Sequence, residues 1–254
     1  MPIPTVSPIT VPGAGSAALR RRVRELTGTG HVLHAGAQAI YARFGDRVVG
    51  VAARGAVQVP ATIATALPVL PAVAVGSPAE LRDGTLYVAG LAVTVDRLVP
   101  TDLPRLTEPV TLPTHDLGQV RDQLPGSALL ALAAGDPAAV RELLGRGDGL
   151  TPVGDDVVSG WLVTRLALGR PVEAVAAAVR EHAHRTTTLS ATLLADAIEG
   201  EAIPEFRALL LALAADRGTD EAVSRLLAIG HTSGAGMLLG AHLALSSNPE
   251  RTPR

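Results

Sequence analysis

The segment "LTEPVTLPTHDLG" (residues 106–118) separates two parts of the chain that differ in composition and in the spacing of their apolar residues. Pro109, Pro113 and Gly118 offer three turn points within this short stretch. Proline lacks the backbone N–H that helices and central strands use, and no apolar period runs through the segment. We therefore predict a linker here and a domain boundary near residue 120.

Before this linker, short runs of Val, Ala, Ile, Leu and Thr alternate with glycine and proline, as in residues 31–55 and 82–100. Such runs are typical of β-strands. Asp83 and Gly84 form a strong turn signal, and residues 85–95 continue as an apolar strand or a bent strand pair. Residues 1–120 are therefore predicted to form a β-rich domain, either barrel-like or a small sheet, with a leading helix.

After the linker, leucine- and alanine-rich segments carry apolar residues at helical spacing. Many of them begin at Pro, Asp, Ser or Thr and end at Gly, as helices do. Residues 121–254 are therefore predicted to form a helical bundle, which makes the whole chain α+β. The predicted helices lie within residues 127–135, 137–145, 156–169, 171–184, 188–200, 204–216, 220–230 and 234–245.

The composition removes several classes of chemistry. The chain has 254 residues, 47% of them hydrophobic, which is enough to build one large core or two smaller ones. It contains no cysteine, which excludes disulfides, thiolate metal sites and a cysteine nucleophile. The chain contains arginine but no lysine, so Schiff-base chemistry and a P-loop lysine are excluded too.

Charge and hydropathy argue against nucleic-acid and membrane partners. The net charge is −2 and aromatic residues make up 2% of the chain, so little is available for stacking on bases. The basic run "RRRVR" (residues 20–24) is predicted to be the solvated face of the first helix. Residues 55–79 are uncharged, but prolines such as Pro60, Pro68 and Pro71 interrupt them, which favours buried strands and turns over a membrane helix. The N-terminus has no basic leader, so we expect a cytoplasmic protein.

The first of three polar clusters in the helical part is "GDGLTPVGDD" (residues 147–156). Gly149 and Gly154 let main-chain N–H groups approach a ligand, and Thr151 adds a hydroxyl. Asp155 and Asp156 fall at the predicted start of a helix. One of them could simply cap that helix, and together they could bind Mg²⁺ in an alternative interpretation.

The second cluster is "HAHRTTTLS" (residues 182–190). Hydroxyls stand where a helix is predicted to begin, among them those of Thr187 and Ser190, and Arg185 supplies a permanent planar charge suited to carboxylate or phosphate. The cluster could bind an anion, although a capped helix explains it equally well.

The third cluster is "GHTSGAG" (residues 230–236). Thr232, Ser233 and Gly234 provide hydroxyls and main-chain N–H groups at another predicted helix start. His231 stands inside this turn and could transfer a proton near neutral pH.

These clusters suggest one anion-binding pocket, because each helix N-terminus carries about half a positive charge. If the three helix starts meet, His231, Asp155 and Asp156 are the candidate catalytic residues. The candidate substrate-binding residues are Gly149, Thr151, Gly154, Arg185, Thr187, Ser190, Thr232, Ser233 and Gly234. Asp155 and Asp156 become metal ligands only in the alternative interpretation, and no other cofactor is implied.

Taken in order, "GDGLTPVGDD", "RTTTLS" and "IGHTSG" resemble the signature segments of the AllH-like family, which is named for a subunit of oxamate carbamoyltransferase. The resemblance covers mainly residues 140–245. It carries over Gly149, Thr151, Pro152, Gly154, Asp155, Asp156, Thr187, Ser190, His231, Thr232, Ser233 and Gly234. A serine commonly stands in the family at the position of Val153, so the first loop lacks one hydroxyl that could bind phosphate.

The resemblance implies a bacterial protein of allantoin or purine nitrogen metabolism. It would help transfer a carbamoyl group between carbamoyl phosphate and an amide-bearing acid such as oxamate, together with FdrA-like and AllG-like partner subunits. Two other functions stay open on the residues alone. One is a Mg²⁺-dependent phosphoryl-group hydrolase or transferase using Asp155 and Asp156, and the other is a non-catalytic scaffold subunit.

Overall fold

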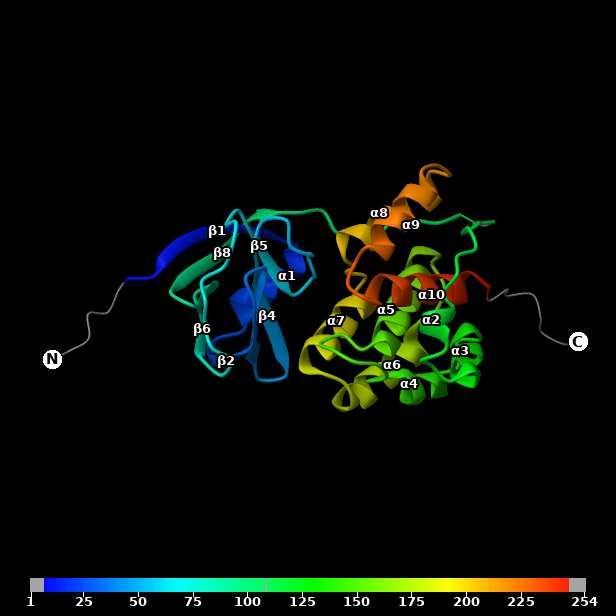
Figure 1. Cartoon of the computed structure of the whole chain (residues 1–254), viewed down its shortest axis with the longest axis horizontal. Coiled ribbons are helices and arrows are strands. Elements are labelled where there is room, and N and C mark those ends of the chain that lie inside the picture. The colour runs from blue at the N-terminus through cyan, green and yellow to red at the C-terminus, as the bar shows by residue number, and fades with distance from the viewer. Residues whose placement is uncertain (1–6, 108, 247–254) are drawn as a thin grey trace, which may run out of the picture. The chain divides into compact units, whose positions relative to one another are not determined.

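The computed structural model describes residues 7–107 and 109–246, and the chain divides into two compact units between Pro100 and Thr101 (Figure 1). The first unit contains the described strands and one helix, and the second unit contains the other described helices. The α+β class predicted from the sequence is therefore confirmed. Glu108, inside the predicted linker, lies outside the described residues.

The first unit is a closed eight-stranded barrel in the order β1-β5-β4-β3-β2-β6-β7-β8. Strand β1 runs parallel to β8 and β4 runs parallel to β5, and all other neighbours are antiparallel. The elements are β1 (Ile9–Gly15), α1 (Ala17–Glu25), β2 (Gly28–Ala35), β3 (Ala39–Phe44), β4 (Arg47–Ala52), β5 (Thr62–Thr65), β6 (Pro78–Arg82), β7 (Thr85–Val88) and β8 (Leu91–Leu98).

Local sequence explains the tightest turns of this barrel. Asp83 and Gly84 both have positive φ, at 52° and 74°, and join β6 to β7, as expected of a two-residue hairpin turn. Ala89 and Gly90 do the same between β7 and β8, so residues 85–95 form a strand pair rather than one strand. Alternate side chains fill the barrel, including the fully buried Val32, Val49, Ile63, Leu81, Leu86 and Val93.

The second unit is helical, and each of the eight segments predicted to be helical contains a helix. The short helix α2 was not predicted. Between Val99 and Leu117 the described residues form no helix or strand. The predicted linker of residues 106–118 stays a prediction. The helices are α2 (Gly118–Arg121), α3 (Gly126–Ala133), α4 (Ala138–Leu143), α5 (Val153–Ala167), α6 (Glu173–His182), η1 (Ala183–Arg185), α7 (Thr188–Ile198), α8 (Pro204–Ala214), α9 (Thr219–Leu227) and α10 (Ser233–Ser246).

Helices α5 and α10 lie side by side and approach each other through glycine (Figure 1). A Cβ atom on Gly160 would overlap the backbone oxygen of Met237, and one on Gly240 would overlap that of Val157. A Cβ on Gly236 would lie 2.9 Å from the Cβ of Asp156. The absence of side chains at these three glycines therefore allows α10 to pack directly on the first turns of α5.

Within the described residues, every helix is too short or too polar to cross a bilayer.

Candidate functional site

The three polar clusters lie against one another in the second unit. The loop of residues 144–152, here called the glycine loop, connects α4 to α5. It contacts the segment that begins α7 and the segment that begins α10 through side-chain hydrogen bonds. The structure therefore brings together three regions that are separated by tens of residues in the sequence.

Asp155 joins the first cluster to the second. It lies in the first turn of α5 and is 2% exposed. Its Oδ1 accepts a hydrogen bond of 2.8 Å from the backbone N–H of Gly145, and its Oδ2 accepts one of 2.6 Å from the Ser190 hydroxyl. The Thr186 hydroxyl also donates to Oδ2. Three donors on one carboxylate hold the glycine loop against the start of α7.

Thr187 makes a second connection between the same two clusters. Its side-chain oxygen accepts from the backbone N–H of Ser190 at 3.0 Å, which caps α7. The hydroxyl donates to the backbone oxygen of Leu150 in the glycine loop at 2.6 Å. Thr187 therefore caps α7, as the capping interpretation expects, and the same side chain also holds the glycine loop.

Asp156 faces the third cluster. It is 4% exposed, and its Oδ2 is buried without a hydrogen-bond partner among the described residues. Burial raises the pKa of this carboxyl to about 8, a nearby hydrogen bond with Ser233 lowers it, and the charge of Asp155 raises it. Since a group with a pKa of about 8 is mostly protonated at pH 7, Asp156 is a neutral carboxylic acid under neutral conditions.

Thr151 and Ser233, here called the hydroxyl pair, connect the glycine loop to α10. Their side-chain oxygens are 3.2 Å apart, and either one can be the donor. Ser233 is the first residue of α10, and both residues are partly exposed. The hydroxyl pair therefore connects the glycine loop to the first residue of α10 at a partly exposed position.

The geometry argues against the interpretation in which one of the two aspartates caps the helix. Helix α5 begins at Val153, two residues earlier than a helix starting at Asp155, and its N-cap residue Pro152 makes no side-chain capping bond. Proline at this position stiffens the entry to the helix. Asp155 and Asp156 are buried in the first turn and bond to, or face, other segments, so neither caps α5.

Gly154 and Gly234 occupy positions of close packing. The backbone N–H of Gly154 donates to the oxygen of Arg146 at 2.9 Å, and that of Gly234 donates to the oxygen of Ile229 at 3.1 Å. A Cβ on either residue would overlap a backbone oxygen. Their role as ligand-binding positions remains a prediction, and these contacts give both residues a structural role as well.

Three other predicted site residues lie at the surface. Gly149 has a φ of 92° and open space around it, so the glycine loop bends there at low cost. Arg185 and His231 are exposed. Neither side chain forms a hydrogen bond or ion pair within the part of the chain that is described, so both are available for a ligand. Thr232 is partly exposed, and its backbone oxygen accepts from the N–H of Gly236 at 2.8 Å.

Gly145 and Gly236 also build the site but were not among the predicted site residues, and Thr186, a hydroxyl of the second cluster, bonds to Asp155. Gly145 stands before the glycine-rich motif, and nothing in its local sequence marks it as a partner of Asp155. Gly236 matters because it gives Asp156 room, which only the packing of α10 on α5 reveals. Val153, where the AllH-like family commonly has serine, is 1% exposed and packs near Gly147 and Gly236. That position therefore faces the protein interior.

The metal alternative, with Asp155 and Asp156 as ligands, stays a prediction. Among the described residues, no group of three or more histidine, aspartate or glutamate side chains is placed to hold a metal ion. The Asp155 carboxylate accepts three hydrogen bonds, so a metal ion bound there would share its oxygen atoms with these donors.

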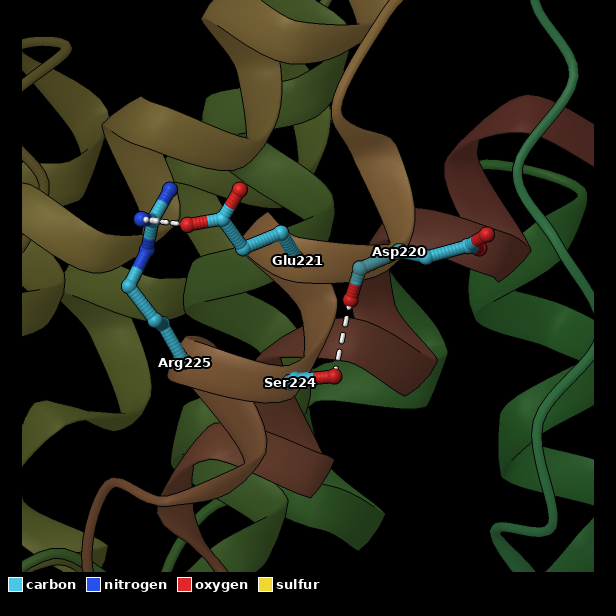
Figure 2. A network of polar contacts seen from close by, with 4 residues as sticks. All are labelled: Asp220, Glu221, Ser224 and Arg225. Carbon is cyan, nitrogen blue, oxygen red and sulfur yellow. Dashed lines mark hydrogen bonds and ion pairs between the residues drawn. The ribbon is translucent and has the colours of Figure 1, made fainter.

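Helix α9 leads into the third cluster and carries its own surface contacts. Figure 2 shows that Arg225 pairs with Glu221, with an N–O distance of 2.8 Å, and that the Ser224 hydroxyl donates to the backbone oxygen of Asp220. Both contacts are exposed and lie within one helix, so they add only a few tenths of a kcal/mol. They stabilise α9 itself and leave the turn at His231 free of side-chain contacts from this network.

Comparison with known proteins identifies the same part of the chain. Residues 143–245 match the family model described as oxamate carbamoyltransferase subunit AllH. The matched segment contains all three polar clusters, so the resemblance seen in the sequence is confirmed over this segment. No solved structure matches the chain.

Proposed function

Because residues 143–245 match the oxamate carbamoyltransferase subunit AllH, we propose that this protein is a subunit of a related carbamoyltransferase. We propose further that it binds a small anionic metabolite, carbamoyl phosphate or oxamate, where the starts of α5, α7 and α10 come together. The finding that best supports this is the hydrogen bonding of three helix starts through Asp155, Thr187 and the hydroxyl pair.

The charges of this region suit an anion. Three helix N-termini bring partial positive charge, and the exposed Arg185 adds a full one. The two aspartates repel an anion less strongly than two full negative charges would. Asp156 is neutral at pH 7, and the charge of Asp155 is compensated by three hydrogen-bond donors. A carboxylate or phosphate would therefore approach without an uncompensated buried negative charge against it.

The chemistry of carbamoyl transfer needs no covalent nucleophile. The amide nitrogen of oxamate would attack the carbonyl carbon of carbamoyl phosphate, forming a C–N bond while the C–O bond to phosphate breaks. Arg185 and main-chain N–H groups would stabilise the phosphate as it leaves. His231 would accept the proton lost from the amide nitrogen. Positioning both reactants side by side provides much of the rate enhancement in such reactions, which fits a chain without lysine or cysteine.

Isothermal titration calorimetry of the full chain with oxamate and with carbamoyl phosphate tests the binding step. We expect binding without Mg²⁺, and we expect Thr151→Val to weaken it about ten- to hundredfold, because a hydroxyl donor to an anion is lost. Asp220→Asn, at an exposed site on α9, serves as the control and should bind like the wild type. Binding that appears only when Mg²⁺ is added would contradict this proposal and favour the metal alternative.

Catalysis requires a separate experiment, because AllH-like proteins are subunits of a larger enzyme. We propose that FdrA-like and AllG-like proteins are the partners. Co-purification from the native host, with an assay of carbamoyl phosphate turnover, should recover those partners and an activity that His231→Gln lowers at least about tenfold. A purified assembly that turns over carbamoyl phosphate equally well with His231→Gln would remove His231 from the mechanism.

A further inference from the structure

Arg185 places a full positive charge just before helix α7. It is the last residue of η1, and Thr186 and the N-cap residue Thr187 separate it from the helix. A helix N-terminus already carries partial positive charge, and the first turn of α7 contains no acidic residue. The exposed Arg185 side chain forms no ion pair or hydrogen bond within the described part of the chain. A cation at this position disfavours the helix by itself, and a bound anion would remove that repulsion.

The backbone of Arg185 lies directly against the glycine loop. A Cβ atom on Gly145 would be 2.3 Å from the backbone oxygen of Arg185 and 3.7 Å from the Cα of Thr186. Gly145 also has a φ of 76°, a left-handed conformation that favours glycine. The loop can therefore approach the Arg185 backbone this closely only because Gly145 has no side chain.

The Asp155 carboxylate fixes the residue that follows Arg185. The Thr186 hydroxyl donates to Oδ2 of Asp155, and the backbone N–H of Gly145 donates to Oδ1 at 2.8 Å. Asp155 is 2% exposed, and hydrogen bonds in such buried surroundings are stronger than in water. On its other side, Arg185 continues into η1 and α6. The backbone of this exposed arginine is thus held at both ends and by the glycine loop.

We propose that Thr186 is a positioning residue, whose hydrogen bond to Asp155 fixes the Arg185 backbone so that the guanidinium binds the phosphate group of a phosphorylated ligand. A guanidinium offers two parallel N–H donors to a phosphate, and a fixed backbone reduces the freedom that is lost on binding. The inference rests on the proposed function, because it takes the anion site at the helix starts as given. It adds Thr186, which no step of that function uses, and it assigns the two reactants to different helix starts.

The charges assign the phosphate to the start of α7 rather than to the start of α10. A phosphate monoester carries a charge of about −1.5 to −2 at pH 7, whereas oxamate carries a single negative charge. Arg185 provides a full positive charge beside α7, while Thr232 and Ser233 offer neutral hydroxyls at α10. The acceptor acid is therefore left to the start of α10.

Adjacent residues of the glycine loop connect these two helix starts. The backbone oxygen of Leu150 accepts from Thr187 at 2.6 Å, and the side chain of the next residue, Thr151, pairs with Ser233 at 3.2 Å. Since neighbouring Cα atoms are about 3.8 Å apart, the two contacts lie within roughly 10 Å of each other. Small molecules bound at the two helix starts are then close enough to touch.

Calorimetric titration of the full chain tests the proposal with two separate probes. In phosphonoacetamide, a methylene group replaces the bridging oxygen of carbamoyl phosphate, so the molecule keeps a phosphate-like group and cannot transfer its carbamoyl group. Oxamate carries a carboxylate instead. Thr186→Val removes the hydroxyl and keeps the size of the side chain, whereas Thr186→Ser keeps the hydroxyl.

We expect Thr186→Val to weaken the binding of phosphonoacetamide about tenfold and that of oxamate less than about twofold. Thr186→Ser should bind both ligands within about threefold of the wild type, because its hydroxyl can still donate to Asp155. Arg185→Gln should weaken phosphonoacetamide about a hundredfold. Adding Thr186→Val to Arg185→Gln should cost less than about a further twofold, because Thr186 acts through Arg185.

Thr101→Val is the matched control. It removes a hydrogen bond of the same kind, from the Thr101 hydroxyl to the Glu201 carboxylate at 3.0 Å, beyond the other end of α7. Helix α7 has 11 residues and therefore spans about 16 Å. The control should accordingly bind both ligands like the wild type.

The proposal is overturned if Thr186→Val binds phosphonoacetamide like the wild type, if it loses affinity for both ligands equally, or if its loss is as large in the Arg185→Gln background. Binding of oxamate but not of phosphonoacetamide by the wild type would also overturn it. If the wild type binds neither ligand, the proposed function fails for these ligands. The positioning of Arg185 is then measured without ligand, by NMR relaxation of the backbone N–H groups.

In the wild type, the order parameter of the Arg185 N–H should be about 0.85, the value of rigid backbone. It should fall toward about 0.6 in Thr186→Val and stay near about 0.85 in Thr186→Ser. Equal order parameters in all three proteins would overturn the inference whether or not a ligand binds.

Discussion

At the scale of single residues, two adjacent aspartates have opposite surroundings. Burial raises the pKa of Asp155, but hydrogen bonds from Ser190, Thr186 and Gly145 oppose that rise. Asp156 has only Ser233 to oppose a larger effect of burial. The sequence shows the pair but not the donors, because those come from segments tens of residues away. The difference between the two carboxyls is therefore a property of the tertiary structure.

The raised pKa of Asp156 predicts how stability depends on pH. The unfolded chain releases this proton near the ordinary aspartate pKa of 3.8, whereas burial raises the pKa of the carboxyl in the folded chain to about 8. The contribution of this proton to the free energy of unfolding is complete below pH 3.8. It is lost as pH rises to about 8, by up to about 1.4 kcal/mol per pH unit. Urea denaturation of the wild type and Asp156→Asn across this range should give a difference that falls with pH and then levels off. A difference independent of pH would contradict the assignment.

Asp155 is predicted to stabilise the fold directly. Asp155→Ala leaves the backbone N–H of Gly145 and the hydroxyls of Thr186 and Ser190 without their acceptor. We expect it to lower the free energy of unfolding by about 3–5 kcal/mol, measured by urea denaturation. Ser190→Ala removes one of the three donors and should cost about 1–2 kcal/mol. An equal loss in both variants would show that the carboxylate does not connect the segments.

At the scale of helices and strands, the contact between α5 and α10 positions the candidate site. Gly160, Gly236 and Gly240 allow the two backbones to touch, and this close approach places Ser233 beside Asp156. A larger residue in such a contact forces a shift of backbone rather than of a flexible side chain.

Gly240→Ala should therefore destabilise the protein, by about 1–3 kcal/mol in urea denaturation. The control is Gly126→Ala at the start of α3, where a Cβ meets nothing within 4 Å. That change should be neutral or stabilise by up to about 1 kcal/mol, because alanine favours helix over glycine. If both variants lose stability equally, the contact between α5 and α10 is looser than described.

Sequence periodicity was sufficient to predict the helices and the β-rich class, because each element has its own local pattern. The hairpin turn at Asp83 and Gly84 was predicted for the same reason. Strand order was not, since β1 pairs with β5 and β8 across distances that no local pattern records. The polar clusters could be found as interruptions of apolar helices. Their roles could not, because the start of α5 at Val153 and the partners of both aspartates depend on packing.

At the scale of the whole molecule, the candidate site belongs to one unit. All of its residues lie after Thr101, in the second compact unit. The residues just after Thr101 also belong to that unit. Thr101 donates to Glu201 at 3.0 Å, Arg207 donates to the backbone oxygen of Asp102, and the N–H of Leu106 donates to the oxygen of Ala167. The unit thus includes the extended segment before α2.

This arrangement predicts where the chain can be cut. A chain of residues 101–254 should fold, by circular dichroism and thermal melting, and should bind oxamate with the affinity of the full chain. A chain that begins at residue 121, the boundary expected from composition, loses the three contacts above and the buried Leu106 and Leu117. It should melt at least several degrees lower. Equal melting temperatures would favour the boundary at residue 120.

The direct backbone contact between α5 and α10 has a consequence for selectivity. Side chains that could slide or change rotamer are missing at the glycine positions of this contact, so α5 and α10 cannot separate gradually to admit a larger ligand. The distance between Asp156 and the start of α10 is fixed when the protein folds. Any adjustment to ligand size would have to come from the glycine loop, which contacts α10 through Thr151 and bends at Gly149. Longer homologues of an acid that binds here should accordingly bind more weakly, to an extent set by how far the glycine loop can move.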